Sequence, residues 1–218
     1  MLDQRAEIIT SRSHLDAARN LLYRVYCQEQ GWYPASNNPS EQHVRSLQSG
    51  DHGLVDAYDD VATWIGLFHE QAVVGCVRLI RRPQDNGRLE IENYFDLVRH
   101  VEYPHEIVEC NRLAIEPSFR RREGMALLHL KFLDLVVSTG ESVLIAAMPG
   151  TGKLAIEYMG VTDTGLSFRY AQDDPEEAHI YLLRNRGAAV PNQRDYLRAK
   201  IASRRKPMSD RTTREPYG

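Results

Sequence analysis

A strand that passes through a short basic turn straight into a helix is the feature that most constrains how this chain folds. Glu106–Glu116 has the β-branched and apolar content of a strand, and Pro117 ends it. The basic segment Arg120–Gly124 follows, and apolar residues then recur at helical spacing until Gly140, at Met125, Leu128, Phe132, Leu135 and Val136. This unit predicts a central strand of a sheet, with the helix covering one face.

Further strands and helices are predicted on both sides of this unit. Strands are indicated at residues 6–10, 62–69, 72–81, 142–148, 166–171 and 178–183, with the second and third joined as a hairpin. Helices are predicted after an N-cap at Ser13 and over Thr151–Met159. The order predicts an α+β fold, with a mixed, mostly antiparallel sheet and helices on both faces.

Two stretches lack this periodicity. Residues 33–60 are rich in Pro, Asn, Ser, Gln and Gly, which predicts a long loop that covers or builds a site. Residues 184–218 hold ten Lys and Arg against three acidic residues, a local charge of +7 in a chain of net charge −3. We therefore predict one domain over residues 1–184 and a basic C-terminal tail over residues 185–218. The remainder, at −10, is not expected to attract nucleic acid.

Cysteine and histidine usage indicates neither a disulfide framework nor a metal site. The three cysteines, Cys27, Cys76 and Cys110, have no metal-ligand spacing, and neither have the histidines. No stretch resembles a signal peptide, and no run of apolar residues approaches the length of a membrane span. We expect a soluble, cytoplasmic protein without a membrane span.

The turn Arg121-Arg122-Glu123-Gly124-Met125-Ala126 joins the central strand to its helix. A glycine-containing turn at a helix start directs backbone N–H groups and the helix dipole at one anion, so it predicts a phosphate cradle. An ordinary basic helix start is the alternative. The turn resembles the Arg/Gln-x-x-Gly-x-Gly/Ala turn of the GNAT superfamily, which holds the pyrophosphate of coenzyme A or the phosphopantetheine of a carrier protein. This resemblance implies donor-binding roles for Leu113, Ile115, Arg121, Arg122, Gly124 and Ala126.

Four further motifs resemble two branches of that superfamily, the acyl-homoserine-lactone (autoinducer) synthases and the long-chain N-acyl amino acid synthases. They are Tyr26…Gly31-Trp32, Asp56-Ala57-Tyr58-Asp59, Gly75-Cys76-Val77-Arg78-Leu79 and Glu109-Cys110-Asn111-Arg112. Two features depart from autoinducer synthases. Leu22 stands where they carry an arginine, with Arg24 two positions away, and the loop from Trp32 to Asp56 is longer. The longer loop is more similar to N-acyl amino acid synthases and exosortase-associated acyltransferases.

The resemblance implies a GNAT-like fold and an N-acyltransferase. Such an enzyme moves a fatty acyl group from an acyl carrier protein or acyl-CoA to the amine of an amino acid, without an acyl-enzyme and without a permanently bound cofactor or metal. It implies that Glu109 is the catalytic base and that the acceptor is bound by Trp32, Asp56, Asp59, Arg78 and Arg112. The chemistry agrees, since an amine arrives as an ammonium and needs carboxylates to attract it and a base to deprotonate it.

Other functions stay open for the same motifs. They are an acyl-homoserine-lactone synthase using S-adenosylmethionine, an ordinary acetyl-CoA-dependent acetyltransferase, and a non-catalytic sensor that binds acyl thioesters.

Each candidate residue also has a structural interpretation. Tyr26 and Trp32 suit core packing, and Asp56 and Asp59 suit a turn before a strand. Glu109 and Arg112 suit a structural ion pair, and Arg78 on an apolar strand requires a carboxylate partner. Cys110 is interpreted as a buried, inert thiol because direct acyl transfer needs no thiol nucleophile.

The segment Pro149-Gly150-Thr151-Gly152-Lys153 resembles a nucleotide-binding P-loop only in part. Ala147 stands where that motif needs glycine, and Leu154 where it needs serine or threonine. The phosphate wrap and the magnesium ligand are therefore both missing, and we predict a turn from strand to helix.

Overall fold

The computed structural model describes residues 4–82, 87–102, 106–120, 123–171, 174–185 and 189–205. Seven strands of this described part form one sheet in the order β1-β4-β5-β6-β7-β9-β8. All neighbouring strands are antiparallel except β6 and β7, which are parallel. The bounds are β1 Gln4–Ile8, β4 Thr63–His69, β5 Ala72–Arg81, β6 Ile107–Ile115, β7 Ser142–Ala147, β8 Thr162–Phe168 and β9 Ala178–Leu183. The predicted fold class and the central position of β6 are confirmed.

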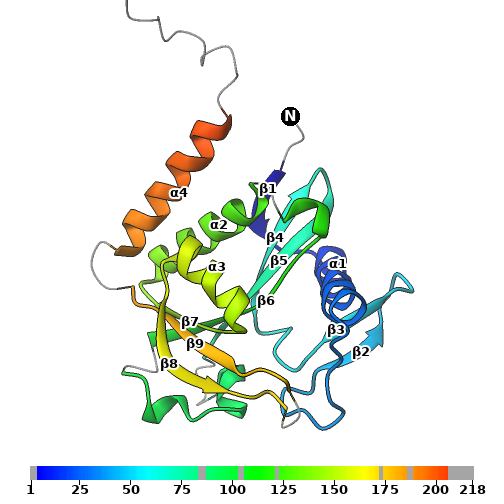
Figure 1. The fold of residues 1–218 in the computed structure, drawn as a ribbon. Coiled ribbons are helices and arrows are strands. Elements are labelled where there is room, and N and C mark those ends of the chain that lie inside the picture. Colours follow the sequence, from blue (N-terminus) through cyan, green and yellow to red (C-terminus); the bar gives the residue numbers. More distant parts are fainter. Residues whose placement is uncertain are drawn as a thin grey trace, which may run out of the picture.

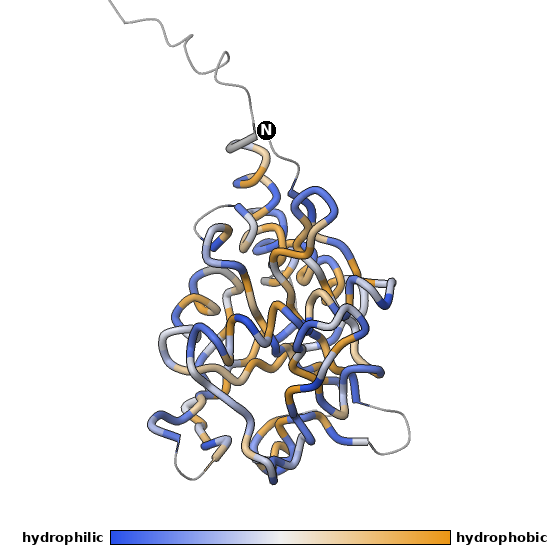
Figure 2. The backbone as a smooth tube through the Cα atoms, turned by 90° about the vertical axis from the view of Figure 1, so that its right-hand side faces the viewer, coloured by the Kyte–Doolittle hydropathy of each residue, from blue (hydrophilic) through white to orange (hydrophobic). Residues whose placement is uncertain are grey.

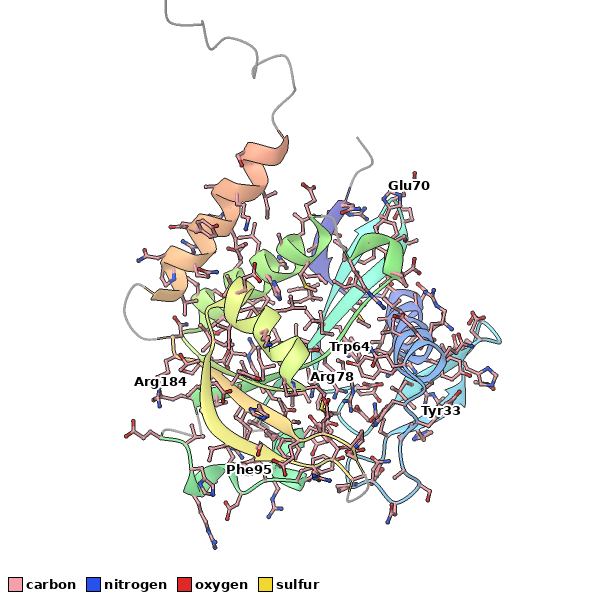
Figure 3. The ribbon with its side chains drawn as sticks, in the orientation of Figure 1. Tyr33, Trp64, Glu70, Arg78, Phe95 and Arg184 are labelled. Carbon is pink, nitrogen blue, oxygen red and sulfur yellow. The ribbon has the colours of Figure 1, made fainter. Side chains whose placement is uncertain are left out.

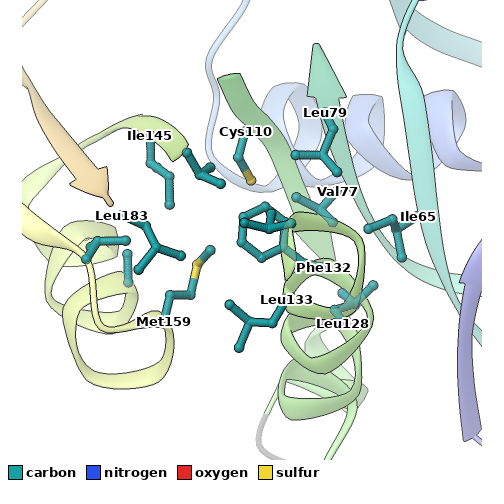
Figure 4. Packing of buried hydrophobic residues seen from close by; sticks show 14 of the residues in the cluster. Ile65, Val77, Leu79, Cys110, Leu128, Phe132, Leu133, Ile145, Met159 and Leu183 are labelled. Atoms are coloured by element: carbon teal, nitrogen blue, oxygen red, sulfur yellow. The ribbon is translucent and has the colours of Figure 1, made fainter. Parts of the chain in front are cut away.

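Helices α2 (Gly124–Thr139) and α3 (Pro149–Met159) cover one face of the sheet (Figure 1). Both end at a glycine with a positive φ, +74° at Gly140 and +70° at Gly160, as the helix-stop pattern predicts. Apolar side chains from the two helices pack against β5, β6 and β7, as Figure 4 shows for Leu79, Cys110, Phe132, Ile145 and Met159. This layer holds β6 rigidly from one side.

The opposite face carries helix α1 (Arg12–Leu22), its π-helical continuation η1 (Tyr23–Glu29), and the short helices η2 (Glu90–Asn93) and η3 (Leu97–Arg99). A two-stranded hairpin of β2 (His43–Ser46) and β3 (His52–Val55) packs against α1. The short helix η5 (Pro117–Phe119) follows β6. Two apolar clusters lie on this face, one beneath α1 and one beneath η2 and η3. In Figure 2 the apolar stretches lie mainly in the interior, whereas the peripheral loops are hydrophilic.

Several predicted bounds need correction. Helix α1 begins two residues earlier than predicted, because Ser11 rather than Ser13 is its N-cap and accepts a hydrogen bond from the backbone N–H of His14 at 3.2 Å. Strand β8 runs from Thr162 to Phe168 instead of 166–171, and its register with β9 shifts between Asp163 and Ser167. The predicted loop over 33–60 contains the β2–β3 hairpin.

Helix α4 (Ala189–Arg205) lies within the predicted basic tail, where the sequence pattern indicates no element. It packs on the outside of α2 (Figure 1) and buries Val190, Leu197 and Ile201. Successive members of this narrow stripe are seven and then four positions apart, and charged residues lie between them. Residues 206–218 of the tail lie outside the described residues. No helix among the described residues is long and apolar enough to cross a membrane.

Candidate functional site

Strands β6 and β7 separate halfway along their length. Their parallel pairing ends at Cys110 and Ile145, although β6 continues to Ile115 and β7 to Ala147. Within the described residues no strand pairs with residues 111–115 on the β7 side. Backbone groups along that edge are therefore open to a partner other than protein, in the middle of the sheet.

A bulge in β6 lies beside this opening. The register between β5 and β6 shifts between Cys76 and Arg78, so that β6 has an additional residue there. Arg112 in the bulge has a φ of +55°, a left-handed conformation that is costly for a side chain larger than glycine. Adjacent residues of a regular strand point to opposite faces, but the bulge lets Asn111 and Arg112 both reach Glu90, at 2.8 and 2.6 Å.

Arg78 is the centre of a buried ionic network. Its side chain is 0% exposed, and its guanidinium lies 5.5 Å from the centre of the Trp64 ring, near the middle of the molecule (Figure 3). It donates hydrogen bonds to Asp56 at 2.6 Å, Asp59 at 2.8 Å and Glu90 at 2.6 Å, and to the side-chain oxygen of Asn111 at 2.9 Å. These contacts occupy the guanidinium, so Arg78 acts by holding carboxylates in place.

Asp56 and Asp59 enter the network from the segment before β4. Asp56 accepts hydrogen bonds from Arg78 and from Arg112, the latter at 2.7 Å, whereas Asp59 accepts from Arg78 and from Arg19 at 2.8 Å. Burial by itself raises the pKa of Asp56, but Arg78 and Arg112 together lower it to about 2. Burial and the neighbouring charge of Asp56 raise the pKa of Asp59. Asp56 is thus the firmly ionised member of the pair.

Glu109 lies on β6 at the edge of this network, and its hydrogen-bond donors within the described part of the chain are uncharged. Its side chain accepts from the backbone N–H of Ile91 at 3.0 Å and from Asn111 at 2.9 Å, and the residue is 2% exposed. Burial, and then the charge of Glu90, raise the pKa of Glu109 to about 7. A carboxyl that titrates near neutrality beside an open strand edge is suited to general base catalysis.

Tyr26 contacts the bulge, and Trp32 packs against Tyr26. The Tyr26 hydroxyl donates to the backbone oxygen of Leu113 at 3.1 Å, and the two rings meet edge to face with centroids 6.2 Å apart. Tyr26 belongs to the π-helical turn η1, a conformation often found at functional sites. Tyr26 thus contacts the site directly, and both Tyr26 and Trp32 also pack against the apolar cluster beneath α1.

The predicted donor side is described in part. Arg121 and Arg122 lie outside the described residues. Gly124 begins α2 and is buried, and a side chain added there would come within 2.5 Å of Leu67, so its first structural role is close packing of α2 against β4. Ile115 belongs to the core cluster beneath α2 and the partly buried Leu113 packs against it, whereas Ala126 is a buried residue of α2 itself.

A comparison with known families decides the classification. Residues 21–130, about half of the chain, match the family described as acetyltransferase (GNAT) domain. The chain belongs to the GNAT family. It is therefore an acyltransferase, and the predicted family membership and enzyme class are confirmed. No curated protein matches the chain.

Solved structures of other GNAT-fold acyltransferases resemble the chain over most of its length. FeeM, an N-acyl amino acid synthase from uncultured soil microbes, is 17% identical with a TM-score of 0.61, over 89% of this chain and 95% of FeeM. BjaI, a CoA-dependent acyl-homoserine lactone synthase with S-adenosylmethionine and isopentyl-CoA, is 17% identical with a TM-score of 0.67, over 92% and 90%. The acyl-homoserine-lactone synthase LasI is 17% identical with a TM-score of 0.61, over 85% and 91%.

Three members of the network in this GNAT chain were not among the predicted site residues. Glu90 lies on a short helix whose position no local pattern indicates, and Asn111 lies inside a motif that was interpreted through Glu109 and Arg112. Arg19 binds Asp59 at 2.8 Å from a position three residues before Leu22, whereas Arg24 contacts Glu116 at 2.6 Å. The unpredicted π-helical turn between Arg19 and Tyr26 alters their relative orientation.

The rejected P-loop has a packing explanation. Gly152 lies in the first turn of α3, and a side chain there would come within 2.0 Å of the Tyr181 hydroxyl. Glycine is therefore favoured at position 152 because the Tyr181 ring occupies the space that a side chain would need. Cys110 is buried, and burial raises the pKa of its thiol far above the usual range, as expected for an inert core residue.

Two surface hollows are lined by residues outside the network. One of about 520 Å³ is lined by residues between Tyr33 and Val44, and another of about 400 Å³ by residues between Arg88 and Val98. None of the buried arginines or carboxylates bound to them lines either hollow. We therefore locate the candidate site by the open edge of β6 and the carboxylates beside it.

Proposed function

We propose that this GNAT acyltransferase transfers a fatty acyl group from an acyl carrier protein or acyl-CoA to the amine of an amino acid, giving an N-acyl amino acid. The observation that carries the proposal is Glu109, a buried carboxyl with a pKa of about 7 next to the open edge of β6. It supports a base that accepts a proton from an acceptor ammonium at neutral pH.

The proposed reaction begins with the acceptor amine beside Glu109 and the donor thioester beside the open edge of β6. Glu109 takes a proton from the ammonium directly or through a water, and the free amine attacks the thioester carbonyl. Backbone N–H groups along residues 111–115 are the proposed donors to the oxyanion that develops. The new C–N bond forms as the C–S bond breaks, and the thiolate takes up the proton lost by the amine. No acyl-enzyme is required.

The proposed acceptor side includes Trp32, Asp56, Asp59 and Arg112. Within the described residues, Arg112 uses its Nε and Nη2 atoms on Asp56 and Glu90, but no hydrogen bond uses its Nη1 atom. That atom is available to the carboxylate of an amino acid. The proposed donor side includes Leu113, Ile115, Arg121, Arg122, Gly124 and Ala126, at the start of α2 and on the strand before it.

An amino acid acceptor is supported by the likeness to FeeM, and the likeness to BjaI and LasI favours a second candidate, an acyl-homoserine-lactone synthase. Both acceptors carry an amine and a carboxylate on one carbon, so the same network suits either.

Product analysis separates these functions. The purified protein is incubated with long-chain acyl-CoA or acyl carrier protein, each with a panel of amino acids or with S-adenosylmethionine, and products are identified by mass spectrometry. We expect N-acyl amino acids and stoichiometric thiol release. Acyl-homoserine lactone as the sole product establishes the second candidate, and transfer of acetyl groups alone refutes the fatty acyl donor. Donor binding without any product identifies a sensor.

A further inference from the structure

Tyr170 lies just after β8, the last strand in the sheet order, and has no role in the site described above. It follows Phe168, the last residue of β8, by two positions, and its ring packs against Phe168 and Tyr94 with centroids 4.8 and 5.0 Å apart. Both neighbours belong to the apolar cluster beneath η2, the helix that carries Glu90. Tyr170 therefore lies on the same side of the sheet as the ionic network.

The hydroxyl of Tyr170 differs from those of the other tyrosines around the network. Tyr94 bonds to the Ser40 hydroxyl at 2.9 Å, Tyr58 accepts from Asn93 at 2.8 Å, and Tyr26 donates to a backbone oxygen. Among the described residues, no hydrogen bond includes the Tyr170 hydroxyl, although its ring is packed on two sides. A partly buried hydroxyl without a protein partner is suited to a ligand.

The charged groups around this hydroxyl determine what it can bind. Burial raises the pKa of Tyr170 well above its usual range, the carboxylates of Glu90 and Glu109 raise it further, and the charge of Arg112 lowers it. The hydroxyl is therefore protonated at neutral pH and can donate a hydrogen bond. Arg112 offers its Nη1 atom, so two donors of the site have no hydrogen-bond acceptor among the residues that the structure describes.

We propose that Tyr170 binds the acceptor, its hydroxyl donating a hydrogen bond to the carboxylate of the amino acid beside Arg112. The ammonium of the same molecule then lies toward Glu109, which fits an α-amino acid with its two charged groups on neighbouring atoms. This assignment rests on the proposed function and makes the carboxylate a requirement for tight acceptor binding.

The test uses two substitutions that each remove only a hydroxyl. Tyr170→Phe keeps the ring contacts with Phe168 and Tyr94, whereas Tyr94→Phe removes the partner of the buried Ser40 hydroxyl. KM is measured for the preferred amino acid, and the amine that lacks its carboxylate is tested as a substrate or competitive inhibitor. The melting temperature of each variant is recorded.

We expect Tyr170→Phe to raise the KM of the amino acid about tenfold, to leave binding of the decarboxylated amine within about twofold, and to leave the melting temperature unchanged. Tyr94→Phe should lower the melting temperature without changing the preference for the carboxylate. An unchanged KM in Tyr170→Phe, an equal effect on both ligands, or a lower melting temperature overturns the assignment. The wild-type protein is assayed first. If it acylates no amino acid, the proposed function itself is refuted, and this failure is distinct from a failure of the Tyr170 assignment.

Discussion

Replacing Glu109 by glutamine tests the chemistry most directly, because the structure predicts opposite effects on rate and on stability. Glutamine has the same shape and accepts the hydrogen bond from Ile91, but it cannot take up a proton. Loss of a general base lowers the rate of acyl transfer by roughly 10² to 10⁴. We therefore expect a folded enzyme that is at least about a hundredfold slower.

The stability follows from the same pKa. An ordinary glutamate has a pKa of 4.5, but Glu109 in the folded chain has one of about 7, so the unfolded chain loses this proton first as pH rises. The wild type consequently loses stability between about pH 4.5 and 7, by about 3 kcal/mol in total. Glutamine avoids this loss but gives up the bond from Asn111, which costs about 1 kcal/mol. At pH 8 the variant should be as stable as the wild type or more stable.

The assay follows thiol release under saturating donor from pH 5.5 to 9, with urea unfolding at pH 5 and 8. The wild-type rate should rise through a pKa near 7, and the variant should lack this inflection. Glu90→Gln is the matched control, because Glu90 binds the two charged side chains Arg78 and Arg112, so that its loss should cost about 3–5 kcal/mol of stability. A folded Glu109→Gln enzyme with the full rate at pH 7 would show that Glu109 is only a structural residue.

Two further predictions concern stability. Because Asp56 has a folded pKa of about 2 against an ordinary 3.8, it should contribute about 2 kcal/mol above pH 4 that is lost as pH falls toward 2. Urea unfolding at pH 2 to 6 should show this dependence in the wild type and a weaker one in Asp56→Asn, and equal slopes would contradict it. Gly152→Ala should cost about 1–2 kcal/mol through collision with Tyr181, whereas Gly150→Ala, which meets no atom within 4 Å, should be neutral or stabilising; similar unfolding midpoints would argue against the packing explanation.

The sequence by itself was sufficient for the central architecture and for several members of the buried ionic network. Strand β6, its turn and helix α2 follow from local periodicity and from glycine and proline at the ends, which depend only on nearby residues. The sequence also predicts the chemical type of partner that Arg78 has, because a buried arginine on an apolar strand must pair with carboxylates. The positions of core residues and the need to pair a buried charge can thus be inferred from the sequence.

Only the tertiary structure decided which carboxylates meet which arginines. Glu90 and Arg19 come from segments whose distance in space depends on strand register and on a π-helical turn, neither of which has a local signature here. The bulge at Arg112 directs the side chains of Asn111 and Arg112 to the same network. In a regular strand these adjacent side chains would point to opposite faces of the sheet. Tyr170, two residues after β8, packs against Tyr94 next to η2, because such long-range contacts arise only when the whole sheet assembles.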